Sequence, residues 1–168
     1  FFDDYLKIKN KSSDGLNSKQ KIFLQIIASF IAMYYLYHSA ELIAETSFIV
    51  PFFKDLIIPM SAFVFISTGM FVLIGSSNAV NLTDGLDGLA ILPSVLIAGA
   101  LGLIAYSMGN QIIADYLYLP HLKLSGELIV FCGALIGSGI GFLWYNTYPA
   151  QIFMGDIGSL TLGAILGI

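Results

Sequence analysis

Long apolar stretches divide this chain, and they limit its fold more than any other feature. They cover residues 22–43, 59–77, 88–108 and 127–144, and a fifth runs over residues 160–168 to the end of the sequence. A helix needs about 20 apolar residues to cross roughly 30 Å of hydrocarbon. The chain is 57% hydrophobic and 11% charged, whereas soluble domains carry about 25% charged residues. The sequence therefore predicts an all-α, polytopic membrane helix bundle with about five transmembrane helices.

The chain ends and the cysteine content set further limits. Phe1 is not a methionine, and Ile168 lies inside an apolar run, so both ends look cut. We therefore interpret residues 1–168 as a single integral-membrane catalytic domain, an internal fragment of a longer protein. Cys132 is the only cysteine, which excludes an intrachain disulfide and a zinc site built from spaced cysteines. The chain has no arginine, so lysine, backbone N–H groups, asparagine or a metal would have to hold any phosphate.

The lysines predict which side of the membrane the polar segments face. Five of the seven lysines lie in residues 1–21, and the positive-inside rule makes that segment a cytoplasmic loop. Two predicted spans separate it from the polar residues 78–89, and two more separate these from residues 145–159. An even number of crossings returns a chain to the same face. Five carboxylates should therefore meet on the cytoplasmic side: Asp3, Asp4, Asp84, Asp87 and Asp156.

The opposite side carries two shorter segments. Residues 46–58 have two β-branched, aromatic-rich runs around Pro51, which predict a short β-hairpin at the outer face. Residues 109–126 are predicted to form an outer loop. In the fourth span, a small-residue face is formed by Gly133, Gly137, Gly139 and Gly141. Gly137 and Gly141 have the G-x-x-x-G spacing, which favours packing inside one bundle over dimerisation. The sequence leaves a homodimer open.

The clustered acids predict a metal-dependent site. Carboxylates that converge on one face repel each other unless a cation or substrate groups compensate them. Oxygen ligands without histidine or cysteine favour Mg²⁺, with Mn²⁺ as the alternative. Mg²⁺ takes one or two protein carboxylates and leaves its other positions to water and substrate phosphates. This points to phosphoryl transfer, in which a metal neutralises a diphosphate and an aspartate orients or deprotonates the nucleophile.

Other polar residues in the same segments fit such a site. Asn78, Asn81 and Asn146 can supply a carbonyl oxygen to a metal or hydrogen bonds to a nucleotide or sugar. Lys7 and Lys21 place positive charge beside it. We expect no nucleic-acid partner.

Each of these features also has a simpler interpretation. Asp84 and Asp87 could cap the following helix, and Asp156 could cap the fifth span. Asp3 and Asp4 could be solvated loop acids. The lysines could serve topology alone, and Phe153 could be a packing residue.

Three motifs in this order resemble the polyprenyl-phosphate N-acetylhexosamine-1-phosphate transferases. They are residues 3–7 (DDYLK), 78–90 (NAVNLTDGLDGLA) and 149–160 (PAQIFMGDIGSL). DDYLK, residues 18–21 (SKQK) and residues 142–146 (FLWYN) are most similar to the bacterial phospho-N-acetylmuramoyl-pentapeptide transferase branch, translocase I of peptidoglycan synthesis. The resemblance covers essentially the whole chain.

The resemblance implies a reaction and a role for each candidate residue. Phospho-MurNAc-pentapeptide would move from UDP-MurNAc-pentapeptide to undecaprenyl phosphate with Mg²⁺, giving lipid I and UMP. Asp3 and Asp4 would contact or activate the lipid phosphate, and Asp84 would belong to the catalytic core. The remaining roles are metal binding by Asp156 and Asn81, uridine binding by Asp87, Asn146 and Phe153, and substrate binding by Lys7, Lys21 and Asn78. Direct attack and a covalent aspartyl intermediate both stay open.

The resemblance also implies where the protein is located and that residues 1–168 lack part of the family's machinery. The protein would be a multi-pass protein of the bacterial inner membrane, in contact with the lipid bilayer, with its active site on the cytoplasmic face. The family's histidine-rich motif and about half of its ten helices are absent from these residues, so we expect the fragment alone to be inactive. Two alternatives remain: a sister enzyme that transfers GlcNAc-1-phosphate, and a cation-coupled transporter with acids near the bilayer midplane.

Overall fold

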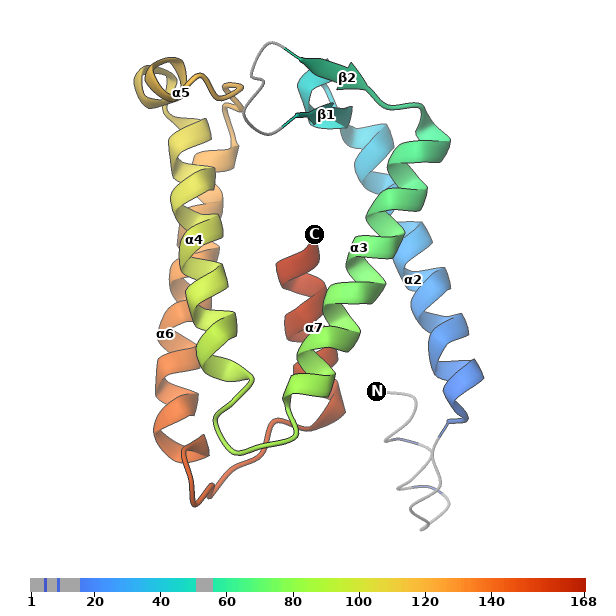
Figure 1. Ribbon diagram of the computed structural model, residues 1–168, viewed down its shortest axis with the longest axis vertical. Coiled ribbons are helices and arrows are strands. Elements are labelled where there is room, and N and C mark those ends of the chain that lie inside the picture. Colours follow the sequence, from blue (N-terminus) through green and yellow to red (C-terminus); the bar gives the residue numbers. More distant parts are fainter. Residues whose placement is uncertain (1–4, 6–8, 10–15, 51–55) are drawn as a thin grey trace.

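The computed structural model describes Tyr5, Lys9 and residues 16–50 and 56–168, and it consists mainly of long apolar helices (Figure 1). Within the described residues, four helices are long and apolar enough to cross a membrane. The predicted all-α membrane bundle is confirmed. The long helices are α2 (Ser18–Ser39), α3 (Ala62–Thr83), α4 (Ile91–Gly109) and α6 (Leu128–Asn146), and the shorter apolar helix is α7 (Gly155–Gly167).

The short elements gather at one end of the bundle. They are η1 (Ile43–Thr46), β1 (Ser47–Ile49), β2 (Ile57–Pro59), α5 (Gln111–Leu117) and η2 (Ser125–Glu127). The strands β1 and β2 pair antiparallel, with Phe48 opposite Ile58, which confirms the predicted hairpin. The tip around Pro51 lies outside the described residues. Helix α5 was not predicted, because seven residues with mixed polarity look like a loop in a hydropathy pattern.

The helices form two packed groups that α7 joins. Helices α4 and α6 lie side by side, α3 packs against both α2 and α7, and α7 also touches α4 (Figure 1). The hairpin and α5 are at the top of Figure 1. The start of α2, the α3–α4 loop and the α6–α7 loop are at the bottom. The described polar segments therefore lie at the same end of the bundle, as expected when two long helices separate each segment from the next.

Large side chains point outward and small ones lie between helices. Phe63 and Phe71 are both 80% exposed, whereas Ala98 and Ser159 are fully buried. Lipid tails are as apolar as leucine, so helices associate in a membrane through close packing and hydrogen bonds between them. A Cβ on Gly163 would lie 2.7 Å from the Cα of Ser77, which shows how closely α7 approaches α3.

Of the four glycines in the predicted small-residue face of α6, Gly139 is the one at which an added Cβ would meet a described residue within 4 Å. A Cβ at Gly137 or Gly141 would meet nothing within 4 Å among the described residues. Gly139, two residues away on the other face of α6, packs against Val95 of α4 instead. The motif spacing gave the right helix but not the rotation of that helix about its axis.

Several helices begin or end away from the predicted limits. Helix α3 continues to Thr83, past the predicted end at residue 77, so the first half of the polar motif is helical. Helix α2 begins at Ser18, within the predicted cytoplasmic loop, and α7 begins at Gly155, before the predicted start at residue 160. Polar side chains lower the hydropathy without interrupting the backbone hydrogen bonds of a helix.

The close approach of α3 and α7 predicts a strong effect of enlarging Gly163. Gly163→Leu should destabilise the protein by about 1–3 kcal/mol or more, because backbone atoms of α3 occupy the space the side chain needs. Gly137→Leu is the matched control, with open space around it in the described part of the chain. Thermal unfolding of the detergent-purified protein measures both changes. Equal unfolding midpoints for the two variants would contradict this packing.

Candidate active site

A cavity of about 280 Å³ opens at the end of the bundle where the polar loops meet. Its wall contains Asn81 at the end of α3, Asp84 to Asp87 in the loop that follows, Asn146 at the end of α6, and residues 153–156 at the start of α7. Six of the eleven predicted site residues line this cavity: Asn81, Asp84, Asp87, Asn146, Phe153 and Asp156. The structure therefore brings together residues from three segments far apart in the sequence.

Asp156 links two other helices to α7. Its Oδ2 is 3.3 Å from the Nζ of Lys21 on α2, and its Oδ1 accepts a hydrogen bond of 3.1 Å from the Nδ2 of Asn81 on α3. Asp156 lies in the first turn of α7, where the helix dipole favours a negative charge. The Lys21 and Asp156 side chains are 34% and 45% exposed, so a ligand can reach them.

Asp84 lies close to a second negative charge. Partial burial, and then the charge of Asp156, raise the pKa of Asp84 above its ordinary value of 3.8. Two carboxyl groups beside one cavity disfavour each other's ionisation unless a cation lies between them. Asp84 directly follows the last residue of α3, and its backbone N–H donates to the Val80 and Asn81 carbonyls of that helix.

Asp87 and Asn146 hold the two loops of the cavity together. The Oδ2 of Asp87 accepts from the backbone N of Ala150 at 3.0 Å. The Oδ1 of the buried Asn146 accepts from the backbone N of Gly88 at 3.0 Å, and its Nδ2 donates to the Ile152 carbonyl at 2.8 Å. Gly88 has φ +75°, a conformation that favours glycine, so the loop can present its N–H to Asn146.

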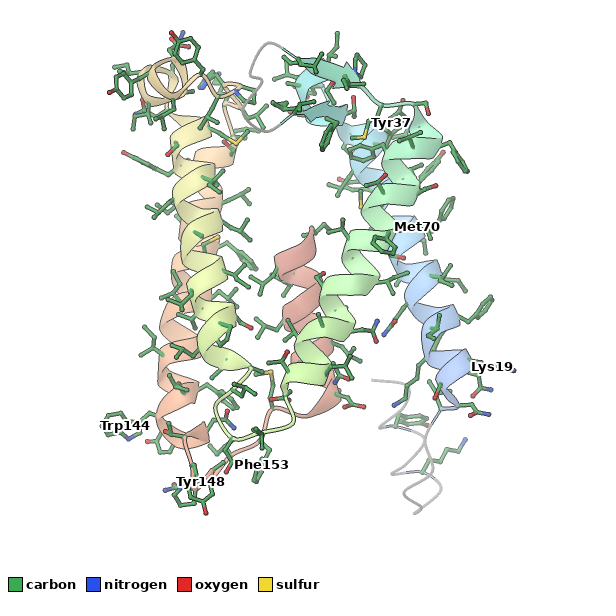
Figure 2. The ribbon with its side chains drawn as sticks, in the orientation of Figure 1. Lys19, Tyr37, Met70, Trp144, Tyr148 and Phe153 are labelled. Atoms are coloured by element: carbon green, nitrogen blue, oxygen red, sulfur yellow. The ribbon has the colours of Figure 1, made fainter. Side chains whose placement is uncertain are left out.

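Phe153 presents its ring at the edge of the cavity. Its side chain is 71% exposed, and Figure 2 shows it at the same end of the bundle as Tyr148 and Trp144. The packing interpretation of Phe153 is not supported by the described residues, since a packed phenylalanine would be buried. An exposed ring beside a polar cavity can stack on a flat ligand.

Asn78 lies on the last turns of α3 and is bonded to α2 rather than lining the cavity. Its Nδ2 donates to the Oε1 of Gln25 at 2.8 Å, and its Oδ1 accepts from the Nε2 of Gln25 at 3.4 Å. Gln25 is one turn after Lys21 on α2, so this pair holds α2 beside α3 one turn further into the bundle than the Lys21–Asp156 contact. Substrate binding by Asn78 stays a prediction.

The capping interpretations fail for the aspartates. Asp84 ends α3, and α4 begins after Ala90 with no capping side chain. The residue that precedes α7 is Met154, so Asp156 is inside the helix. Asp3, Asp4 and Lys7 lie outside the described residues, and their predicted roles stay predictions.

The donor set fits a hard divalent cation. The described residues contain no group of three or more His, Cys, Asp and Glu side chains that could hold a metal alone. Mg²⁺ usually binds one or two carboxylates together with water and substrate phosphates. Asp156, with Asp84 and the carbonyl oxygen of Asn81 on the same cavity, matches that smaller requirement.

Sequence reasoning missed Ser159 and Gln25. Ser159 is fully buried, accepts a hydrogen bond of 2.8 Å from Asn81 and donates one of 3.0 Å to the Gly155 carbonyl. Its spacing of three residues from Asp156 places it on the same side of α7, which is the one signal that the sequence held. Gln25 follows Lys21 by four residues, a spacing that likewise places the two side chains on the same side of α2.

The raised pKa of Asp84 predicts a pH-dependent stability. The folded state penalises ionised Asp84, so stability falls as the pH rises from about 3.8 through the raised folded pKa. In metal-free buffer, Asp84→Asn should therefore raise the unfolding midpoint at pH 7 and leave it unchanged below pH 3.8. The exposed Asp115 at the other end provides the control, Asp115→Asn. An Asp84→Asn midpoint at or below the wild-type value at pH 7 would refute this electrostatic account.

The chain matches a protein family over its full length. The family model described as "Glycosyl transferase family 4" matches residues 1–168, which is the whole chain. That match supports a membrane-bound transferase that moves a phosphosugar to a polyprenyl phosphate. The chain belongs to glycosyl transferase family 4, within the polyprenyl-phosphate hexosamine-1-phosphate transferase superfamily.

Proposed function

We propose that this chain is part of a Mg²⁺-dependent enzyme that transfers phospho-MurNAc-pentapeptide from UDP-MurNAc-pentapeptide to undecaprenyl phosphate. The products are lipid I and UMP. The observation that carries the proposal is the meeting of Asn81, Asp84 and Asp156 on one cavity, with Lys21 paired to Asp156. The choice of the peptidoglycan branch comes from the DDYLK, SKQK and FLWYN segments of the sequence.

The reaction requires one bond to form and one to break. A phosphate oxygen of the lipid attacks the sugar-linked phosphorus of the nucleotide substrate, and the bond from that phosphorus to the UMP oxygen breaks. Phosphoryl transfer of this kind depends on positioning and on neutralising negative charge. Asp156 with Asn81 would hold Mg²⁺, which would supply positive charge to neutralise the diphosphate.

The other residues have separate tasks in this proposal. Lys21 places its ammonium group beside the same carboxylate, where it can attract a phosphate. Asp87 and Asn146 fix the loops that form the nucleotide side of the cavity, and the Phe153 ring is exposed there for stacking on uracil. Asp84 would belong to the catalytic core, and Asp3 and Asp4 would contact the lipid phosphate.

The transporter alternative lacks support in the described helices. Helices α2, α3, α4 and α6 contain no aspartate or glutamate. Cation-coupled transporters place their ion sites near the bilayer midplane. The described acids lie instead in loops, in the short elements η1, α5 and η2, or in the first turn of α7, as a site at the membrane surface requires.

The first test is the Mg²⁺-dependent release of UMP by the intact protein in membranes or detergent. Asp156→Asn should lower this activity by more than about 100-fold. Loss of a residue that only orients a metal ligand lowers activity about 10–100-fold, and loss of the ligand itself should lower it further. Asp115→Asn removes an exposed carboxylate at the opposite end and should leave activity unchanged. Wild-type activity in Asp156→Asn would refute the site. A retained unfolding midpoint shows that the variant is folded.

The second test distinguishes the sugar that is transferred. We expect the intact protein to use UDP-MurNAc-pentapeptide, and we expect UDP-GlcNAc neither to serve as donor nor to compete. The product is measured as radiolabelled lipid-linked sugar. Preferential use of UDP-GlcNAc would assign the chain to the sister enzymes that transfer GlcNAc-1-phosphate and would leave the roles of Asp84 and Asp156 intact.

A further inference from the structure

Ser159 makes two hydrogen bonds that together restrict a neighbouring side chain. The residue lies on α7, fully buried between α7 and α3. Its hydroxyl is 3.0 Å from the carbonyl oxygen of Gly155, one turn earlier in the same helix. A serine hydroxyl has a single hydrogen, and a carbonyl can only accept, so this hydrogen points to Gly155. The Ser159 oxygen can then only accept from its second neighbour.

That second neighbour is the amide of Asn81. Its Nδ2 lies 2.8 Å from the Ser159 oxygen and 3.1 Å from the Oδ1 of Asp156. An amide nitrogen has two hydrogens, and an ionised carboxylate only accepts. Both hydrogens of Asn81 are therefore used. Rotating the amide by half a turn would place its oxygen against two acceptors, which is unfavourable in a partly buried position.

The orientation of the amide decides what Asn81 offers to the cavity. Its nitrogen is held by Ser159 and Asp156, so the carbonyl oxygen is the polar atom left for a ligand. In the described part of the chain this oxygen has no hydrogen-bond partner. Asn81 lines the cavity beside Asp156. A cation or a hydrogen-bond donor fits this oxygen, whereas a phosphate oxygen does not.

We propose that Ser159 is a positioning residue that turns the Asn81 amide so that its oxygen, not its nitrogen, faces the cavity. Ser159 itself does not touch the ligand. The proposal rests on the proposed function only for the identity of that ligand, a divalent cation shared with a diphosphate. Without Ser159, one hydrogen of the Asn81 amide loses its acceptor, and the amide can rotate.

The chain provides a matched control for a purely structural role. Ser77 is also a buried serine between α3 and α7, 6% exposed, and its hydroxyl donates to the Leu160 carbonyl at 2.8 Å. Ser77→Ala removes a hydrogen bond between the same two helices without touching Asn81 or Asp156. If Ser159 served only to pack α7 on α3, the two alanine variants would behave alike.

The experiment measures Mn²⁺ binding to the intact protein by electron paramagnetic resonance, together with thermal unfolding. We expect Ser159→Ala to weaken Mn²⁺ binding by about 10–100-fold, as for other groups that orient metal ligands. Ser77→Ala should bind Mn²⁺ like the wild type while lowering the unfolding midpoint to a similar extent. Adding Ser159→Ala to Asn81→Ala should not weaken binding further, because residues that act through one another are not additive.

The possible outcomes separate this proposal from the proposed function. Unchanged Mn²⁺ affinity in Ser159→Ala, or equal losses in Ser159→Ala and Ser77→Ala, would overturn the positioning role even if Mg²⁺-dependent UMP release is present. Weakened binding in Ser159→Ala alone supports the positioning role even if no UMP is released, in which case only the proposed reaction fails. A wild-type protein that binds no Mn²⁺ overturns both.

Discussion

The arrangement of the site depends on the carboxylate of Asp156. Lys21 reaches it across 135 positions of sequence and Asn81 across 75, so this one group is in contact with side chains from the ends of both α2 and α3. An ion pair that is this exposed contributes little to the free energy of folding. Its importance lies in placing the Lys21 ammonium group, the Asn81 amide and the Asp156 carboxylate side by side at the same end of the bundle.

The apolar helices make that placement possible. In lipid, no hydrophobic force drives one apolar helix onto another, so the contact surfaces must fit closely. Gly163 and Gly139 provide such surfaces, with α7 against α3 and α6 against α4. The buried serines Ser77 and Ser159 then fix α7 on α3 through hydrogen bonds. A small change in the rotation of α7 would move Asp156 away from both of its partners.

Hydropathy was enough to predict the helix bundle and, through the number of spans, the common end of the described polar loops. Two β-branched, aromatic-rich runs were enough to predict the hairpin. These features follow from lengths and compositions, which are properties of segments. The rotation of each helix is a property of packing, and the sequence did not reveal it: Gly139 rather than Gly137 touches α4. The pairing of Asn78 with Gln25 was missed for the same reason, since it depends on which faces of α2 and α3 meet.

The polar residues of the site fall into two groups. The groups differ in the hydrogen bonds that their side chains make, whereas each group contains both an asparagine and an aspartate. Both polar atoms of Asn146 are bonded to backbone, and Asp87 is tied to Ala150, so these side chains first of all shape the loops. The Asn81 oxygen and the Asp84 carboxyl face the cavity with no such bonds from the described residues. The charge of Asp156 raises the pKa of Asp84, and a cation that neutralised Asp156 would lower that pKa again. Cation binding and the ionisation of Asp84 are therefore coupled through Asp156, the same residue that contacts side chains of both α2 and α3.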